Sequence, residues 1–284
     1  MIIKNAIKAY ELIKNDFPIF SKSDVYELIE HISKKKYDLL VLNPNEELQV
    51  NFFRKYLKIK VKLKKGVPIA YITKNKMFCG LNFKINNKVL IPRNESELIV
   101  QYACNFLKNK KNIKVLDLCC GSGCIGISTV YLNRKSINKI TFADISKAAL
   151  KITKQNNKLL NLKNNVKFIK GDFLDPFINK EKFDLILCNP PYIKYGDLNV
   201  SDSVFKYEPH ISLFAKEEGL YFYKKMFANI EKLVDISKPF NIIFEIGWDQ
   251  KEKLEKLISL NPNIKYEFKE DFSKLWRNLI ISNK

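Results

Sequence analysis

Histidine is scarce in this sequence, whose 284 residues include only His31 and His210. A Ser/His/Asp triad needs a histidine as its general base, and a metal site built from several histidines needs more than two. Neither kind of site is well supported. His210 follows Pro209, a context that favours an ordinary loop residue over a proton shuttle.

The six cysteines match no disulfide or metal pattern. Cys119, Cys120 and Cys124 lie close together, but they form no pair of Cys-x-x-Cys knuckles, so we expect no metal. The remaining three are interpreted as small buried apolar residues: Cys79, Cys104 and Cys188. The lack of a secretory disulfide framework favours a reducing, cytoplasmic location.

Long apolar runs, internal repeats and disordered tracts are also missing. Met1, Ile2 and Ile3 are followed at once by Lys4 and Lys8. Neither the core of a signal peptide nor a membrane span is therefore expected, and we expect no membrane partner.

Acidic residues are outnumbered, because 30 Asp and Glu residues stand against 50 Lys and Arg residues and leave a net charge of +20. Such a charge can bind phosphate backbones. Lysine is abundant throughout the chain, however, and runs at 34–36, 62–65 and 108–111 are expected on solvated surfaces. The charge is interpreted as a composition bias that can help the protein meet an acidic partner. Nucleic acid is not required as a partner.

Length and periodicity predict two domains joined by a linker. The first domain, residues 1–74, is predicted to be a small helical domain. Three helix starts are predicted there, near Ile3, at Ser23-Asp24 and at residues 43–47.

A β-hairpin linker is predicted over residues 75–93, because residues 78–90 alternate in polarity about Asn86-Asn87. The second domain, residues 94–284, begins with a helix at 98–107 and then alternates strands with helices. Strands are predicted at 113–118, 140–144, 166–170, 183–188, 242–246, 264–268 and 276–281.

The tetrapeptide Asn189-Pro190-Pro191-Tyr192 directly follows one of these strands and is the most informative motif. The side-chain carbonyl of Asn189 and the backbone carbonyl of Pro190 are suitable fixed acceptors, because proline restricts the neighbouring dihedrals. Two acceptors can hold both N–H bonds of an amide or exocyclic amine, whose lone pair is delocalised. Tyr192 offers a flat face for packing. The motif therefore indicates methyl transfer to a planar nitrogen.

A second motif, Cys119-Cys120-Gly121-Ser122-Gly123, follows the predicted strand at 113–118. Glycines there let a nucleotide-like ligand approach the backbone. The next strand ends in Asp144, at the position where an acid holds ribose hydroxyls in nucleotide-binding α/β units. Gly171-Asp172 follows the third strand. All of these motifs fall at the carboxyl ends of strands, where open parallel sheets bind ligands.

With these motifs the chain resembles the class I S-adenosylmethionine-dependent methyltransferases, and within them the protein-glutamine N5-methyltransferases that modify peptide chain release factors. The resemblance covers roughly residues 66–281 and includes signature segments at 66–71, 78–83, 90–98, 207–209, 218–220, 244–247 and Gln250. It implies an α/β fold with a seven-stranded, mostly parallel Rossmann-like sheet that ends in an antiparallel edge. A small helical N-terminal domain, joined by a β-hairpin, would recognise the substrate.

The resemblance also implies roles for single residues, with S-adenosyl-L-methionine as methyl donor and no metal. The methionine end of the donor would lie at residues 119–123, its ribose at Asp144, and its adenine near Asp172 and Phe173. Residues 189–192 would hold the glutamine of the Gly-Gly-Gln loop of a release factor. Asn189, Pro190 and Tyr192 are the implied catalytic residues, and Asn189 would also lie beside the methyl donor.

Two residues depart from the pattern of this family: Cys119 stands where glycine is usual, and Asn94 where proline is usual. Cys119 adds a side chain where the backbone nears the cofactor, so we expect a changed affinity or a changed local turn. Asn94 is expected to loosen only an interdomain segment. Glu208 either braces the catalytic loop or caps it, and the sequence favours neither role.

Three alternative functions stay open. The same tetrapeptide handles an exocyclic amine on a flipped DNA or RNA base, although no inserted region for reading nucleic acid is evident. Glutamine methylation of a ribosomal protein is a nearer alternative, which residues 93–97 disfavour only modestly. The third is a cofactor-binding scaffold without turnover, against which the intact tetrapeptide argues.

Overall fold

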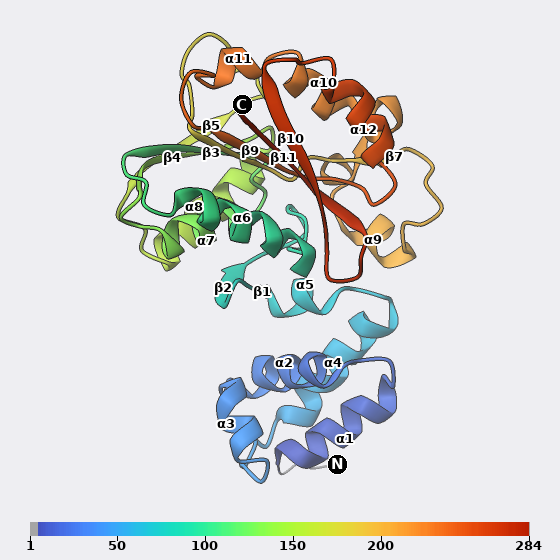
Figure 1. The fold of residues 1–284 in the computed structure, drawn as a ribbon. Coiled ribbons are helices and arrows are strands. Elements are labelled where there is room, and N and C mark those ends of the chain that lie inside the picture. The colour runs from blue at the N-terminus through green and yellow to red at the C-terminus, as the bar shows by residue number, and fades with distance from the viewer. Residues whose placement is uncertain (1–4, 284) are drawn as a thin grey trace. The chain divides into compact units, whose positions relative to one another are not determined.

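The computed structural model describes residues 5–283, and the chain forms two compact units that divide after Asn75 (Figure 1). Ile3, near which the first helix is predicted to start, lies outside the described residues. Within residues 5–283, every helix is too short or too polar to cross a membrane.

The N-terminal unit is built from the helices α1 (Ala6–Asp16), α2 (Lys22–Ser33), α3 (Tyr37–Leu42), α4 (Phe52–Lys64) and α5 (Ile69–Thr73). Ile13, Leu28 and Tyr56 come from three of these helices and are fully buried in one apolar core. The Tyr56 hydroxyl donates to Asp16 Oδ2 over 2.6 Å, so the polar end of this buried ring is satisfied.

The predicted start of the second helix at Ser23-Asp24 is wrong by two residues. α2 is capped by Ser21, whose side chain accepts a hydrogen bond from the Asp24 N–H over 3.1 Å. The Asp24 carboxylate accepts from the Ser21 N–H in return, over 2.9 Å. This reciprocal capping box satisfies two free N–H groups and so decides where the helix begins.

The predicted helix start at residues 43–47 is also wrong. Asn43 ends α3, where its N–H donates to Leu39 O. Its side chain donates to the Glu46 carboxylate over 3.0 Å, which holds the following residues in a loop. The next helix, α4, begins only at Phe52.

A hairpin is present in the linker, but the predicted turn at Asn86-Asn87 is wrong. β1 (Asn75–Phe78) pairs with β2 (Leu81–Lys84) across Cys79 and Gly80, whose φ angles are 49° and 71°. Two positive φ angles suit a tight two-residue hairpin turn. Asn86 instead forms an Asx turn, in which its side chain accepts from the Lys88 N–H over 2.9 Å.

A seven-stranded sheet forms the centre of the C-terminal unit, in the order β10-β11-β9-β6-β3-β4-β5 (Figure 1). Its strands are β3 (Ile113–Leu118), β4 (Ile137–Asp144), β5 (Asn165–Lys170), β6 (Leu185–Cys188), β9 (Asn241–Glu245), β10 (Ile264–Glu270) and β11 (Trp276–Asn283). Neighbours from β9 to β5 pair in parallel, and β11 runs antiparallel to both β9 and β10. The predicted α/β fold, with its mostly parallel sheet and antiparallel edge, is confirmed.

Helices cover both faces of this sheet (Figure 1). One face packs against α6 (Glu97–Leu107), α7 (Cys124–Leu132) and α8 (Lys147–Leu159), and the other against α10 (Tyr221–Phe227), α11 (Ile230–Leu233) and α12 (Lys251–Ile258). Within β3, Val115 joins the first layer, and Leu116 and Leu118 join the second. Because both of their faces are buried, the central strands β6 and β9 are nearly continuous apolar runs in the sequence.

Shorter elements connect these layers. They are the 3-10 turns η1 (Asn94–Ser96), η2 (His210–Ser212) and η3 (Glu217–Gly219), the helix α9 (Asp202–Tyr207), and the parallel pair β7 (Ile193–Lys194) and β8 (Phe214–Ala215). β3 lies where the strand order reverses, with β4 and β5 on one side and β6 and β9 on the other. Such a switch point opens a crevice at the carboxyl ends of the strands.

Asp117 lies in β3, beside this crevice, and is 1% exposed. Its Oδ2 accepts from the Gly126 N–H of α7 over 3.0 Å. Burial raises the pKa of Asp117 to about 8, and this rise exceeds the lowering by the hydrogen bond.

This raised pKa gives a prediction about stability. The native state holds a proton that the unfolded state releases near the ordinary pKa of 3.8, so native stability should fall as pH rises from the unfolded pKa of 3.8 to the native pKa of about 8. Asp117→Asn removes this titratable group. Any effect of the substitution on the unfolding free energy that is independent of pH cancels when two pH values are compared. We expect the unfolding free energy of the variant, relative to the wild type, to rise by about 1–4 kcal/mol between about pH 5 and pH 8. Urea unfolding at both pH values measures this, and a constant difference would contradict the prediction.

Candidate active site

The carboxyl ends of β3, β4 and β6 surround a cavity of about 930 Å³, counted with its open mouth. The predicted cofactor residues that line it are Cys119, Cys120, Gly121, Ser122, Asp144, Asp172, Phe173 and Asn189. Gly123 lies behind this lining, where it serves as the N-cap residue of α7.

The loop after β3 turns through three residues with left-handed backbones. Cys119, Gly121 and Gly123 have φ angles of 54°, 55° and 78°. A Cβ atom on Gly123 would lie 2.5 Å from Thr153 Cγ2, so the contact of α7 with α8 requires glycine here. A Cβ atom on Gly121 would meet no protein atom closer than 4.0 Å, so at this residue the backbone is open to the cavity.

The backbone of Cys119 adopts a conformation that suits glycine, the residue that the resemblance leads us to expect at this position. A non-glycine residue in the left-handed region costs roughly 1–2 kcal/mol. The Cys119 thiol packs beside the thiol of Cys188, the last residue of β6. The chain thus keeps a turn suited to glycine, and the predicted effect of Cys119 on cofactor affinity stays a prediction.

Asp144 ends β4 and faces this loop. One carboxylate oxygen accepts from the Gly121 N–H over 2.9 Å, and the other accepts from the Ser146 N–H over 2.8 Å. Burial raises the pKa of Asp144, and the two backbone hydrogen bonds oppose this rise. Each oxygen keeps another lone pair, so the side chain can accept hydrogen bonds from two hydroxyls of a ligand.

Phe173 and Phe222 give the cavity an apolar wall. Their rings meet edge to face, with centroids 5.0 Å apart at an angle of 74°. Ile145, directly after Asp144, lines the same cavity, and the exposed Asp172 lies at its edge. Such a wall suits a flat aromatic ring.

A second cavity, of about 1,060 Å³ with its mouth, adjoins the tetrapeptide at residues 189–192. Pro190 and Tyr192 line this second cavity, whereas Pro191 lines the first, although all four residues are predicted to bind substrate. Asn189 lines both. This side chain is therefore part of the wall that the two cavities share.

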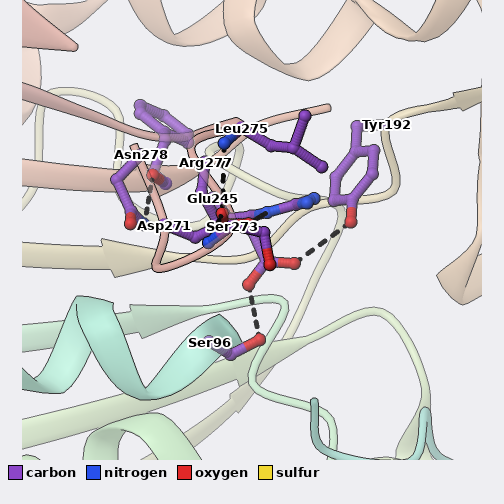
Figure 2. A network of polar contacts seen from close by, with 9 residues as sticks. Ser96, Tyr192, Glu245, Asp271, Ser273, Leu275, Arg277 and Asn278 are labelled. Carbon is purple, nitrogen blue, oxygen red and sulfur yellow. Dashed lines mark hydrogen bonds and ion pairs between the residues drawn. The ribbon is translucent and has the colours of Figure 1, made fainter. Parts of the chain in front are cut away.

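A buried carboxylate, Glu245, ties the tetrapeptide to the centre of the sheet (Figure 2). Glu245 ends β9 and is 2% exposed. Its Oε1 accepts from the Tyr192 hydroxyl over 3.1 Å, and its Oε2 accepts from the Ser96 hydroxyl. Ser96 Oγ in turn accepts from Asn189 Nδ2 over 3.2 Å. Burial raises the pKa of Glu245, whereas the two hydroxyl donors and the Arg277 guanidinium lower it.

The end of the tetrapeptide is fixed from two further elements. Gln250 Nε2 donates to the Tyr192 carbonyl oxygen over 2.9 Å, and Gln250 Oε1 accepts from the Gly247 N–H over 2.9 Å. Gly219, at φ 85°, packs so closely that a Cβ atom there would lie 2.0 Å from the Tyr192 carbonyl oxygen. The backbone at Tyr192 therefore has one available position.

Glu208 braces the segment that leads into the site. Its buried carboxylate accepts from the Ile91 N–H over 3.0 Å and pairs with the Arg93 guanidinium. Leu90 and Arg93 line both cavities. These contacts favour bracing over capping as the role of Glu208. The segment that Glu208 braces is residues 90–93, however, and not the catalytic loop that was predicted.

Several site residues have no predicted role: Arg93, Ser96, Glu245, Gly219 and Gln250. Their only signal in the sequence is their place inside the signature segments, which are far apart along the chain. The fold brings these segments around residues 189–192, which neither spacing nor periodicity can reveal.

His210 lines neither cavity, whereas Cys119, Cys120 and Cys124 line the first. The His210 ring is exposed, and its Nε2 lies 2.7 Å from the Phe205 carbonyl oxygen. In the part of the chain that the structure describes, no three His, Cys, Asp or Glu side chains gather as a metal site.

Comparison with known proteins identifies the family. The model of the methyltransferase small domain matches residues 96–207. The release factor glutamine methyltransferase of Mycoplasma mycoides subsp. mycoides is 44% identical over 274 residues, which cover 95% of this chain and 96% of that protein. This chain belongs to the release factor glutamine methyltransferase family. The member from Clostridium acetobutylicum is 34% identical and covers 98% of this chain and 97% of its own length.

A crystal structure shows the same fold at greater distance. A methyltransferase from Pyrococcus furiosus aligns with a TM-score of 0.50 and 18% identity, over 80% of this chain and 98% of that chain. This likeness concerns the fold alone. The resemblance to protein-glutamine methyltransferases, seen first in the motifs, is confirmed by the relatives of the family.

The close contact at Gly219 gives a second prediction. We expect Gly219→Ala to displace the Tyr192 carbonyl, to destabilise the fold by about 1–3 kcal/mol and to lower the rate of methyl transfer at least tenfold. Gly80→Ala is the matched control, because Gly80 also has a positive φ of 71° but no atom near its Cβ position. Urea unfolding and kcat are measured for both variants, and equal losses in both would contradict the role of the contact.

Proposed function

We propose that this protein transfers a methyl group from S-adenosyl-L-methionine to the side-chain amide nitrogen of the glutamine in the Gly-Gly-Gln motif of peptide chain release factors. One observation carries the proposal: Asn189 lines both a cavity suited to a nucleoside and a second cavity lined by Pro190 and Tyr192. The family membership supplies the substrate class. Release factors act in the cytoplasm, where we place the protein.

The first cavity fits S-adenosyl-L-methionine. The half-buried Asp144 carboxylate has free lone pairs for the ribose hydroxyls, and Gly121 leaves its backbone open for the methionine end. Phe173 and Phe222 would pack against the adenine. When bound, this cofactor supplies an electrophilic methyl group.

The second cavity would hold the glutamine. Asn189 Oδ1 and the Pro190 carbonyl oxygen would each accept a hydrogen bond from one N–H of the glutamine amide. The glutamine nitrogen would then be directed toward the first cavity. The Tyr192 ring would pack against the amide plane. Alignment of this kind contributes on the order of 7–11 kcal/mol, so the site needs no strong base. The nitrogen would keep both of its protons during methyl transfer, and because the resulting protonated N-methyl amide is very acidic, it would lose one of them to water.

Residues 1–74 would recognise the release factor outside the catalytic unit. The net charge of +20 would favour an acidic surface on this partner. Neither a metal nor nucleic acid is part of the proposed reaction.

Asp144→Asn tests the cofactor site. The change replaces one of two accepting oxygens with an NH2 group that opposes the Gly121 or Ser146 N–H. We expect the dissociation constant for S-adenosylmethionine, measured by calorimetry, to rise by about 10–100-fold, which corresponds to about 1.4–2.8 kcal/mol. Unchanged affinity would place the ribose elsewhere.

Asn189→Ala tests the catalytic role. The purified protein is incubated with S-adenosylmethionine and an unmethylated release factor, and peptide mass spectrometry locates the added methyl group. We expect methylation of the Gly-Gly-Gln glutamine by the wild type and by Asn263→Ala, which changes an exposed asparagine before β10. Asn189→Ala should lower the rate by about 100-fold or more, because a fixed acceptor is lost. Transfer only to ribosomal protein or nucleic acid would overturn the proposal.

A further inference from the structure

The hydrogen bonds around Ser96 form a chain whose direction is fixed at its Glu245 end, and Figure 2 shows this end. A carboxylate only accepts hydrogen bonds. The Ser96 hydroxyl therefore gives its single proton to Glu245 Oε2. Only lone pairs remain on Ser96 Oγ, so Asn189 must turn its NH2 group toward it, at 3.2 Å.

This direction decides which end of the Asn189 amide is left for a ligand. With Nδ2 held by Ser96, Oδ1 is the atom that remains for the cavities that Asn189 lines. The reversed amide would present two N–H donors instead. A site with acceptors holds an NH2 group, whereas a site with donors repels one.

The Glu245 end of this hydrogen-bond chain has little freedom to reverse its direction. Glu245 pairs with Asn278 in the register of β9 and β11, and its backbone oxygen accepts from the Tyr223 hydroxyl over 2.8 Å. Its second carboxylate oxygen already accepts from Tyr192. Ser96 is 2% exposed, so solvent gives it few alternative partners.

Building on the proposed function, we infer that Glu245 and Ser96 are positioning residues that fix the polarity of the Asn189 amide. The site then presents only acceptors and takes a side chain that ends in NH2. Glutamate, which has the same shape as glutamine, would bring its own acceptors against those of the site. The buried network thereby selects an amide over the corresponding acid.

Glu245→Gln tests this inference with almost no change in shape. The new glutamine would accept from Tyr192 through Oε1 and donate to Ser96 through Nε2. Ser96 would then donate to Asn189 Oδ1, which reverses the amide. We expect kcat to fall by about 100-fold or more, while the dissociation constant for S-adenosylmethionine stays within about twofold.

Three further variants separate positioning from general damage. Glu267→Gln changes an exposed glutamate of β10 and should leave kcat unchanged. Ser96→Ala should lower kcat by about tenfold, because the Asn189 amide loses the hydrogen-bond acceptor that fixes its orientation. Ser96→Thr keeps the hydroxyl and should restore most of the rate. If Glu245→Gln fails to fold, the Ser96 pair carries the test, and equal rates for Ala and Thr would overturn the inference.

In the variant Asn189→Asp, the same Glu245→Gln change is expected to raise kcat instead of lowering it. Asn189→Asp has acceptors at both ends, but with Glu245 in place two carboxylates compete for one Ser96 proton. Adding Glu245→Gln restores a consistent chain, because the new glutamine donates to Ser96 and Ser96 donates to the new aspartate, which keeps one oxygen for the substrate. We expect the double variant to have a higher kcat than Asn189→Asp alone. A further loss would show that Glu245 acts only through stability.

The amide can also be observed without a substrate. In protein labelled with 15N-asparagine, the Asn189 NH2 signal is identified by its absence in Asn189→Ala. We expect Glu245→Gln, but not Glu267→Gln, to shift this signal. If the wild type methylates no release factor and the signal shifts, the proposed function fails and the inference stands. If the wild type methylates release factor while Glu245→Gln changes neither kcat nor the signal, the inference fails and the function stands.

Discussion

The buried carboxylate of Glu245 is the interaction on which the geometry of the site depends. A buried charge without partners is costly, and here the partners are the Ser96 and Tyr192 hydroxyls, with the Arg277 guanidinium nearby. Because two of these partners lead to the tetrapeptide, satisfying the charge also positions the residues that would hold a substrate. Gln250 and the close packing of Gly219 fix the same backbone from the other side. Stability and positioning are thus combined in one network.

The two cavities assign separate tasks to the two halves of the sheet. The ends of β3 and β4 supply the glycine loop and Asp144, whereas the end of β9 and the loops near it form the second cavity. Asn189, after β6, lies between these groups because β6 is the neighbour of both β3 and β9. A reaction that depends on alignment needs only fixed acceptors and an apolar wall. This agrees with a chain that has two histidines and places neither in the site.

Local sequence signals predict much of this arrangement. Apolar runs in the sequence predict the buried parallel strands. Motifs at the carboxyl ends of parallel strands lie at the same edge of the sheet, so the sequence alone predicts that Asp144 and Asn189 lie close together. The predictions fail where side chains compete locally. The N-cap of α2 is Ser21 and not the predicted Ser23. The hairpin turn lies at Cys79-Gly80 and not at the predicted Asn86-Asn87. The roles of Ser96 and Glu245 are not predictable from spacing, because their contact joins residues 149 positions apart.

The most direct measurement is a crystal structure of the protein with S-adenosylhomocysteine and a peptide that contains Gly-Gly-Gln. We expect the ribose hydroxyls on Asp144, with the glutamine nitrogen about 3 Å from both Asn189 Oδ1 and the Pro190 carbonyl oxygen and facing the sulfur. A glutamine bound away from the tetrapeptide, or an Asn189 amide that turns its nitrogen toward the substrate, would contradict it.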